Sequence, residues 1–219
     1  MLSLLKRPIN QLLLVLVIAC FGLSIFRVLY SESAHYLFLV WNLFLAFVPL
    51  LIVQLPFFER SKSFFTFSFI AFCWLLFFPN APYILTDLFH LSENSTMPIW
   101  YDLVLILLYA WTGLLAGFYS LKIIEQKLQL FVTGRWRQFG IIGLIFLSSF
   151  GIYLGRYLRF NSWDLLKDPG SLLAQVFDRF SHPMDHPRTW GFTIFMGFFL
   201  SLIYVSVQFI QRSVKQKTV

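Results

Sequence analysis

The sequence predicts an all-α integral membrane protein with about six transmembrane helices. Two observations support this fold class. The 219 residues are 58% hydrophobic and only 12% charged, whereas an ordinary soluble domain carries about 25% charged residues. The mean hydropathy is +0.74. A water-soluble chain of this length has too little interior to hide so much apolar surface. We therefore expect a lipid bilayer to cover part of it.

Six apolar runs follow one another along the chain, each close to the roughly 20 residues that a spanning helix needs. No alternation of polar and apolar residues competes with helices. No composition break separates domains, so we expect one transmembrane helical domain over 1–219. The predicted spans cover residues 11–30, 36–54, 63–80, 100–121, 138–156 and 189–210.

The first apolar run resembles a lipoprotein signal, because Lys6 and Arg7 precede it and residues 17–20 look like a cleavage site ending at Cys20. A cleaved signal has a short apolar core followed by a polar exit. Here the apolar run continues through Phe26. We therefore expect an uncleaved first span.

Basic residues divide unevenly between the two sides that six spans define. With a cytoplasmic N-terminus, eleven Lys and Arg fall inside and six outside. Because bases are retained on the cytoplasmic side, we expect a multi-pass cell-membrane protein with both termini in the cytoplasm. The bases that give the net charge of +7 lie in short loops between apolar runs, which is the pattern of membrane topology. We therefore expect no nucleic-acid partner. The inner bases are Lys6, Arg7, Arg60, Lys62, Lys122, Lys127, Arg135, Arg137, Arg212, Lys215 and Lys217, and the outer ones are Arg27, Arg156, Arg159, Lys167, Arg179 and Arg188.

The acidic residues gather on the predicted outer side. Acids barely influence insertion, so topology does not explain this asymmetry, and it suggests an outer face with a polar role. Only Glu59 and Glu125 fall inside. The outer acids are Glu32, Asp87, Glu93, Asp102, Asp164, Asp168, Asp178 and Asp185.

One outer group combines carboxylates with an imidazole. Asp87 and His90 follow Pro79 and Pro82, which should end the third span, and a helical turn would put them on one face. Asp102 lies at the start of the fourth span. A carboxylate beside an imidazole can bind a divalent metal, relay a proton or form an ion pair, so these three are predicted catalytic residues. Alternatively, they are solvated groups at span ends, with Asp102 favoured by the helix dipole.

A second polar group lies at the outer end of the fifth span. Arg156 and Arg159 would share a helical face, and Asn161 and Asp164 follow them. Arginine binds carboxylate or phosphate in a bidentate manner. The four residues are therefore predicted to bind an anionic ligand, such as a lipid or polyprenyl phosphate headgroup. Alternatively, the arginines pair with outer aspartates and tie the span ends together.

The last outer connection contains apolar residues at helical spacing and predicts an amphipathic helix on the outer membrane surface. Ser171 is its expected N-cap. His182 and His186 would bind a metal from one continuous helix, but Pro183 and Pro187 oppose such a helix. They are therefore poorly placed as metal ligands. The apolar residues are Leu172, Leu173, Val176, Phe177 and Phe180.

Three strings together resemble a bacterial family of multi-spanning membrane proteins, catalogued as domain of unknown function 1361. They are PNAPYILTDLFH at 79–90, WYD at 100–102 and GRYLRFNSWD at 155–164. The resemblance covers the chain from about the second span to the sixth. It implies an integral membrane protein of bacterial type and transfers no catalytic residue.

Two functional hypotheses stay open. In the first, Asp87, His90 and Asp102 converge with the arginines in an outer site under the 168–187 segment. The site binds an anionic or lipid-linked ligand, with or without a divalent metal for hydrolysis or transfer. In the second, the same residues form an ion-pair network in a non-enzymatic scaffold, accessory or permease-like protein. No soluble-enzyme motif is present, and no charged residue lies near a span centre, which disfavours an ion-coupled transporter.

Overall fold

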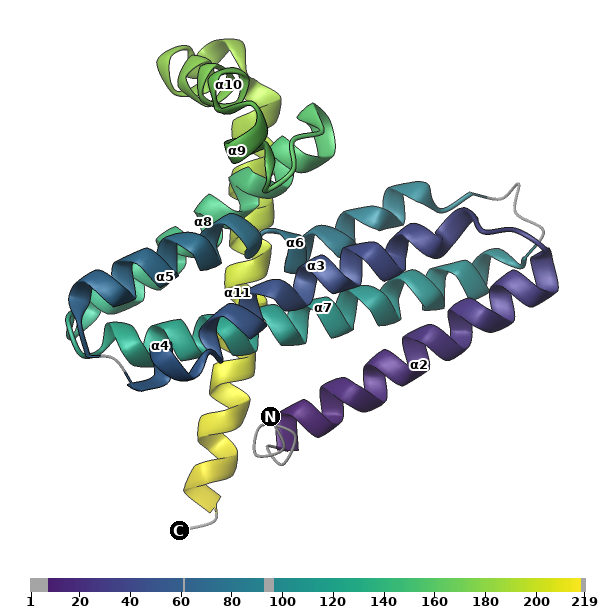
Figure 1. Cartoon of the computed structure of the whole chain (residues 1–219), viewed down its shortest axis with the longest axis horizontal. Helices are drawn as coiled ribbons and strands as arrows, with labels where there is room; N and C mark the ends of the chain where they lie inside the picture. The colour runs from purple at the N-terminus through teal and green to yellow at the C-terminus, as the bar shows by residue number, and fades with distance from the viewer. Residues whose placement is uncertain (1–7, 61, 93–96, 218–219) are drawn as a thin grey trace. The chain divides into compact units, whose positions relative to one another are not determined.

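The computed structural model describes residues 8–60, 62–92 and 97–217, and every regular element in these ranges is helical (Figure 1). The chain divides into two compact units, 1–124 and 125–219, which are considered separately below. The expectation of a single domain stays a prediction. The elements are α2 (Pro8–Ser31), η1 (His35–Leu37), α3 (Phe38–Val53), α4 (Pro56–Arg60), α5 (Phe64–Phe77), α6 (Asn80–Tyr83), η2 (Ile84–His90), α7 (Ile99–Leu128), α8 (Arg135–Leu158), α9 (Asp164–Lys167), α10 (Pro169–Ser181), η3 (Pro183–Asp185) and α11 (Pro187–Lys217).

Six segments are long and apolar enough to cross a membrane, which confirms the predicted number of spans. The predicted end of the third span was wrong. α5 ends at Phe77, but helical turns continue through α6 and η2 to His90. Pro79 is the N-cap of α6 and Pro82 lies in its first turn, where backbone N–H groups have no intrahelical partner and proline costs no hydrogen bond. The six segments are Pro8–Ser31, His35–Phe58, Phe64–His90, Ile99–Leu128, Arg135–Leu158 and Pro187–Ile210.

Several charges that the topology prediction used cannot be placed. Lys6, Arg7 and Glu93 lie outside the described residues, and so do the side chains of Glu59, Arg212, Lys215 and Lys217.

Unit 1 packs around α7, the most buried of the six spans. Its core combines residues of α2, α3, α6, η2 and α7. Polar side chains add specific links inside this apolar bundle. The hydroxyls of Ser24 on α2 and Tyr109 on α7 lie 2.7 Å apart, and Trp74 on α5 donates to Ser120 on α7 at 2.9 Å. Such links fix which faces of the helices meet.

Close backbone approach between α6 and α7 depends on two glycines. A Cβ added at Gly113 would lie 2.9 Å from the carbonyl oxygen of Ala81, and one at Gly117 would lie 2.6 Å from the Cβ of Ala81. The two glycines are four residues apart, so they form one small-residue stripe on α7. The bulk of any side chain there would push α6 away.

Unit 2 is built on the pairing of α8 with α11. A Cβ added at Gly197 of α11 would lie 2.6 Å from the ring of Phe146 on α8. At the other end of the pair, Glu125 accepts hydrogen bonds from Tyr204 at 2.8 Å and Gln208 at 3.0 Å. Arg137 lies 3.7 Å from the second Glu125 oxygen.

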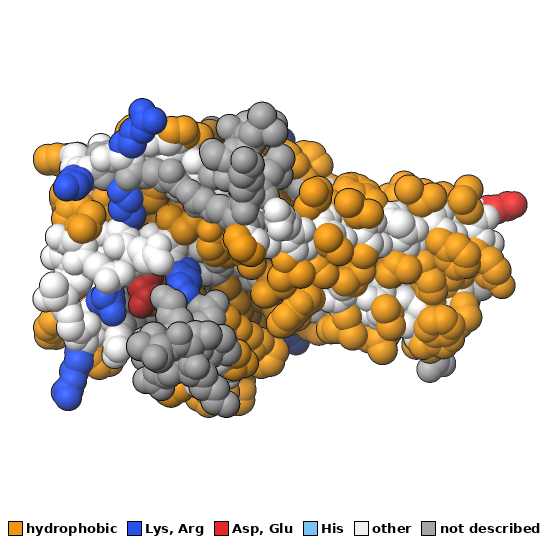
Figure 2. Space-filling view, turned by 90° about the horizontal axis from the view of Figure 1, so that it is seen from below, with side chains coloured by type: hydrophobic (Ala, Val, Ile, Leu, Met, Phe, Trp, Pro, Cys, Tyr) orange, Lys and Arg blue, Asp and Glu red, His pale blue; other side chains and the backbone are white. Residues whose placement is uncertain are grey.

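The outer surface of the helices is strongly apolar. Figure 2 shows hydrophobic side chains over most of the extended part of unit 1, with an acidic group at its tip. Phe65 is 86% exposed and Leu29 is 76% exposed. A contiguous apolar surface of this kind requires a non-aqueous surrounding. The chain is therefore a multi-pass membrane protein, as its six candidate spans indicate.

We expect Gly117→Ala to lower the melting temperature of the detergent-solubilised protein, because the new methyl group overpacks the contact with Ala81. The rough cost is about 1–3 kcal/mol. The matched control is Gly143→Ala on α8, where an added Cβ meets nothing within 4 Å. Equal melting temperatures of the two variants would contradict the close packing of α6 on α7.

Candidate functional site

A buried ion pair joins α2 to α7 in unit 1. Arg27 donates through Nε to Asp102 Oδ1 at 2.7 Å and through Nη2 to Asp102 Oδ2 at 3.2 Å. The side chains are 4% and 0% exposed. The guanidinium thus grips both carboxylate oxygens in the bidentate geometry that makes such pairs strong. Asp102, a predicted catalytic residue, has both oxygens engaged by one arginine.

Tyr36 of η1 extends this contact to η2. The Arg27 guanidinium carbon lies 4.3 Å from the centre of the Tyr36 ring, a cation–π geometry. The Tyr36 hydroxyl donates to the backbone oxygen of His90 at 2.9 Å. Arg27 Nη1 also donates to the carbonyl of Ser33 at 3.3 Å. One arginine therefore ties together α2, α7 and the ordered turn before α3.

Asp87 is held in a second polar contact. It is 1% exposed, and its Oδ2 accepts a 2.8 Å hydrogen bond from Nδ2 of Asn42 on α3. Asn42 therefore acts as the interhelical hydrogen-bond donor that its place in an apolar span indicates. His90 is exposed, and its ring lies 5.2 Å from that of Phe38. Asp87 and His90 share the 3₁₀ helix η2, but one faces the core and the other does not.

In unit 2, Arg156 and Arg159 do not continue one helical face, which corrects the prediction. α8 ends at Leu158, and Arg159 adopts the left-handed conformation with φ 61°. This turn reverses the chain and lets the Phe160 N–H bond the Leu154 carbonyl at 3.2 Å. A non-glycine residue in this region is strained by roughly 1–3 kcal/mol. The Arg159 side chain is exposed in this conformation.

Asn161 and Asp164 meet in a local turn. Asp164 Oδ2 accepts the Asn161 backbone N–H at 2.7 Å, and Asn161 Nδ2 lies 3.5 Å away. Asp164 thereby stabilises the first turn of α9. This contact is confined to unit 2. That Arg156, Arg159, Asn161 and Asp164 meet the Asp87–His90–Asp102 group stays a prediction.

The amphipathic segment forms a helix, but its predicted cap was wrong. α10 begins at Pro169, and Asp168 Oδ1 accepts the Ser171 N–H at 3.1 Å. Asp168 rather than Ser171 is the N-cap, because proline fits the first helical position and shifts the cap before it. The apolar face is uncovered, since Leu173, Phe177 and Phe180 are all exposed.

His182 and His186 flank the short 3₁₀ helix η3 and do not share one continuous helix, as the prolines predicted. Both contact one carboxylate. The Asp178 carboxylate accepts hydrogen bonds from His186 Nε2 at 2.8 Å and from His182 Nδ1 at 3.3 Å. The hydrogen bond with His186 and, less strongly, the one with His182 hold the pKa of the Asp178 carboxyl below its ordinary value. These contacts tie the last turn of α10 to the segment that leads into α11.

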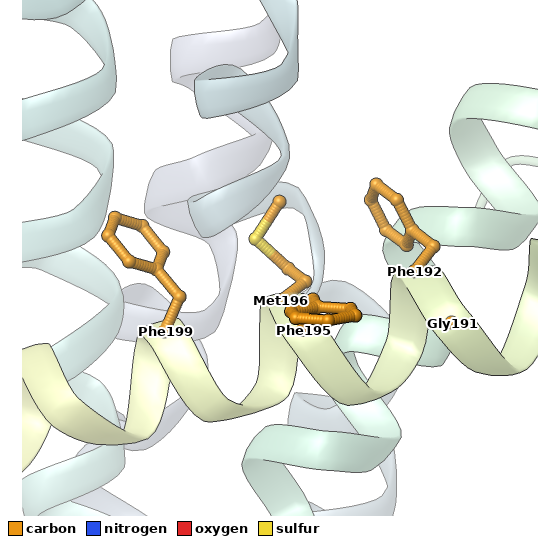
Figure 3. Close-up of a pocket in the computed structure, with 5 residues that line it drawn as sticks. All are labelled: Gly191, Phe192, Phe195, Met196 and Phe199. Carbon is orange, nitrogen blue, oxygen red and sulfur yellow. The ribbon is translucent and has the colours of Figure 1, made fainter.

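Among the described residues, no group of three or more His, Cys, Asp and Glu is arranged to hold a metal ion. A hollow of about 300 Å³ lies along α11 instead (Figure 3). All of its lining residues are apolar, so it does not coincide with any predicted polar site. They are Gly191, Phe192, Phe195, Met196 and Phe199.

Sequence reasoning missed Arg27, Tyr36 and Asp178 as site residues. Arg27 lies within an apolar run and is separated from Asp102 by 75 residues, so no spacing rule links them. The signal that was available is the position of Arg27 itself, because an arginine inside a span normally has a specific partner.

The chain matches the model of a family described as protein of unknown function (DUF1361) over residues 41–203. No match was found among curated proteins or among solved structures. The matched residues run from α3 into α11 and contain the strings that suggested the resemblance. Since they make up well over half of the sequence, the chain belongs to the DUF1361 family.

Proposed function

We propose that this chain is a non-enzymatic integral membrane protein of the cell membrane, in which Asp87, His90 and Asp102 fix the ends of the helices. The observation that carries this proposal is the bidentate Arg27–Asp102 pair, in which the carboxylate is fully buried and both of its oxygens bind one arginine. The Asn42–Asp87 bond supports the same conclusion. The catalytic role of the three residues stays a prediction.

In this proposal both termini lie in the cytoplasm, and the connections that follow His90 and Leu158 lie outside. The excess of bases on the opposite side supports this orientation. In it, α10 lies in the outer interface with its apolar side chains in the bilayer and its charges in water. The exposed Leu173 and Phe177 support this placement.

A second candidate function is the binding of an anionic, phosphate-bearing ligand by the outer connection of unit 2. The exposed Arg159, held in a left-handed turn, favours it. Arg188 lies 6.0 Å from the Tyr157 ring centre. No carboxylate within ion-pair distance of Arg159 or Arg188 occurs among the residues described. Their charges are therefore available to an external anion.

The Arg27–Asp102 pair is tested by a double-mutant cycle on the detergent-solubilised protein. We expect Arg27→Met and Asp102→Leu each to lower the free energy of unfolding by about 3–5 kcal/mol, since each leaves one buried charge unpaired. The double variant should recover much of that loss, because it leaves neither charge. Glu32→Gln, at an exposed position, is the control. Additive losses in the double variant would contradict a structural pair.

Orientation is tested by single cysteines in a Cys20→Ala/Cys73→Ala background. We expect Ser92→Cys and Met184→Cys to react with an impermeant maleimide on intact cells, and Thr133→Cys to react only after permeabilisation. All three positions are exposed in the structure. Labelling of 92 and 184 from opposite sides would overturn the proposed topology.

The anion-binding candidate is tested with purified protein titrated with phosphatidylglycerol and analysed by native mass spectrometry. We expect Arg156→Gln/Arg159→Gln to weaken lipid binding about threefold or more, because two outer positive charges are lost. Arg135→Gln, at the opposite end of α8, is the matched control. Unchanged binding in the double variant would remove these two residues from the site.

A further inference from the structure

Two arginines are buried in the described part of the chain, and their surroundings differ. Arg27 is 3% exposed and Arg179 is 5% exposed. The first is neutralised by Asp102. The second has no carboxylate within ion-pair distance among the described residues. Asp178, its neighbour in sequence, contacts His182 and His186 instead.

Arg179 is also short of hydrogen-bond acceptors. Its Nη1 donates to the backbone oxygen of Gln175 at 2.8 Å and to Gln175 Oε1 at 2.7 Å. Its Nε is buried and has no partner within the described structure. Gln175 is neutral, so these bonds leave the positive charge uncompensated. A buried charge without a counter-ion is costly, far more so than a buried neutral group.

Further unpartnered donors lie on the adjacent part of α11. Thr189 Oγ1, Trp190 Nε1 and Thr193 Oγ1 are buried and make no hydrogen bond in the described structure. Aromatic contacts bring this helix to α10, because the Phe180 ring lies 5.1 Å from that of Trp190. The same Phe180 ring lies 5.6 Å from Phe150 on α8. Arg179 directly precedes Phe180 in the chain, and Thr189 directly precedes Trp190, so both residues flank the contact between the two rings.

The unpartnered groups share one chemical property, since all can donate a hydrogen bond and one carries a positive charge. What these unpartnered groups lack is a negatively charged acceptor, because the Asp178 carboxylate contacts His182 and His186 instead. Phosphate satisfies this requirement, because its oxygens match the fork of the guanidinium and accept several further bonds.

We propose that Arg179, with Thr189 and Trp190, binds a phosphate group at the junction of α10 and α11. Trp190 is the fourth residue of α11, a position typical of the aromatic belt where lipid headgroups begin. The site therefore lies at the depth at which bilayer phosphates occur. The inference deepens the anion-binding candidate function and rests on it, but it assigns the principal contact to Arg179 rather than to the exposed arginines.

The test uses the purified full-length protein in detergent with three probes: phosphatidylglycerol, phosphatidylcholine and inorganic phosphate. We expect Arg179→Met to weaken phosphatidylglycerol binding at least tenfold, measured by native mass spectrometry. In lipid-free detergent its melting temperature should equal or exceed that of the wild type, because an unpaired buried charge is gone. Added lipid should raise the melting temperature of the wild type and not of the variant. The matched control is Arg135→Met, an exposed position expected to change neither readout.

A second variant keeps the proposal testable if Arg179→Met does not fold. Arg179→Lys retains the charge but loses the planar fork, and we expect it to weaken binding several-fold while keeping the wild-type melting temperature. Thr189→Val removes one donor and should weaken binding two- to threefold.

The outcomes separate the sources of the phosphate. A shift produced by inorganic phosphate and lost in Arg179→Met identifies a free phosphate site, and a shift produced by phosphatidylglycerol alone identifies a lipid headgroup. Phosphatidylcholine binding lost in the same variant shows that the phosphate itself, and not net lipid charge, is recognised.

Three results would overturn the inference. If Arg179→Met lowers the melting temperature equally with and without lipid, the arginine is only structural. If Arg179→Met leaves lipid binding intact while Arg156→Gln/Arg159→Gln weakens lipid binding, the chain binds an anion but Arg179 is not the contact. If the wild type binds none of the probes, both fall together.

Discussion

A charge inside a bilayer has to be neutralised where it lies, and in unit 1 this constraint determines how the helices are arranged. Arg27 lies four residues before the end of α2 and is 3% exposed. Its pairing with Asp102 sets the rotation of α2 against α7, because only one face of each helix brings the two groups together. Tyr36 then positions η1 and η2 against the same guanidinium. The hydrophobic effect does not select these rotations, since lipid covers an apolar face as well as protein does, so specific polar contacts and close packing have to do so.

Hydropathy was enough to predict the helical class and the number of spans. Each span is a run whose apolar character does not depend on its neighbours, so a local window detects it. The end of the third span was not predictable from the prolines at 79 and 82, because proline breaks a helix in its interior but is tolerated in a first turn. The structure starts a new turn at Asn80, which makes both prolines compatible with it. The cap of α10 was misplaced for a related reason, since Ser171 and Asp168 are both good N-caps and only the place of Pro169 decides between them.

The candidate site was less predictable than the fold because its contacts are non-local. The sequence indicated polar residues on one side of the membrane, but it did not indicate their partners. Asp87, His90 and Asp102 were interpreted as one candidate group, whereas the structure joins Asp87 to Asn42 and Asp102 to Arg27. Hydropathy identifies a helix but not its rotation, and partner choice depends on rotation. For Arg159, a helical extrapolation failed because α8 ends one residue earlier in a left-handed turn.

The separation of Arg27 from Asp102 also has a consequence for biosynthesis. The carboxylate that neutralises α2 in the folded protein lies 75 residues later in the chain. At translation rates of about 5–20 residues per second, it emerges roughly 4–15 seconds after the arginine. During that interval the first span carries a cation for which its final partner does not yet exist. Until the fourth span is made, the Arg27 side chain can reach the membrane surface by snorkelling. The contact that fixes α2 against α7 can form only after that.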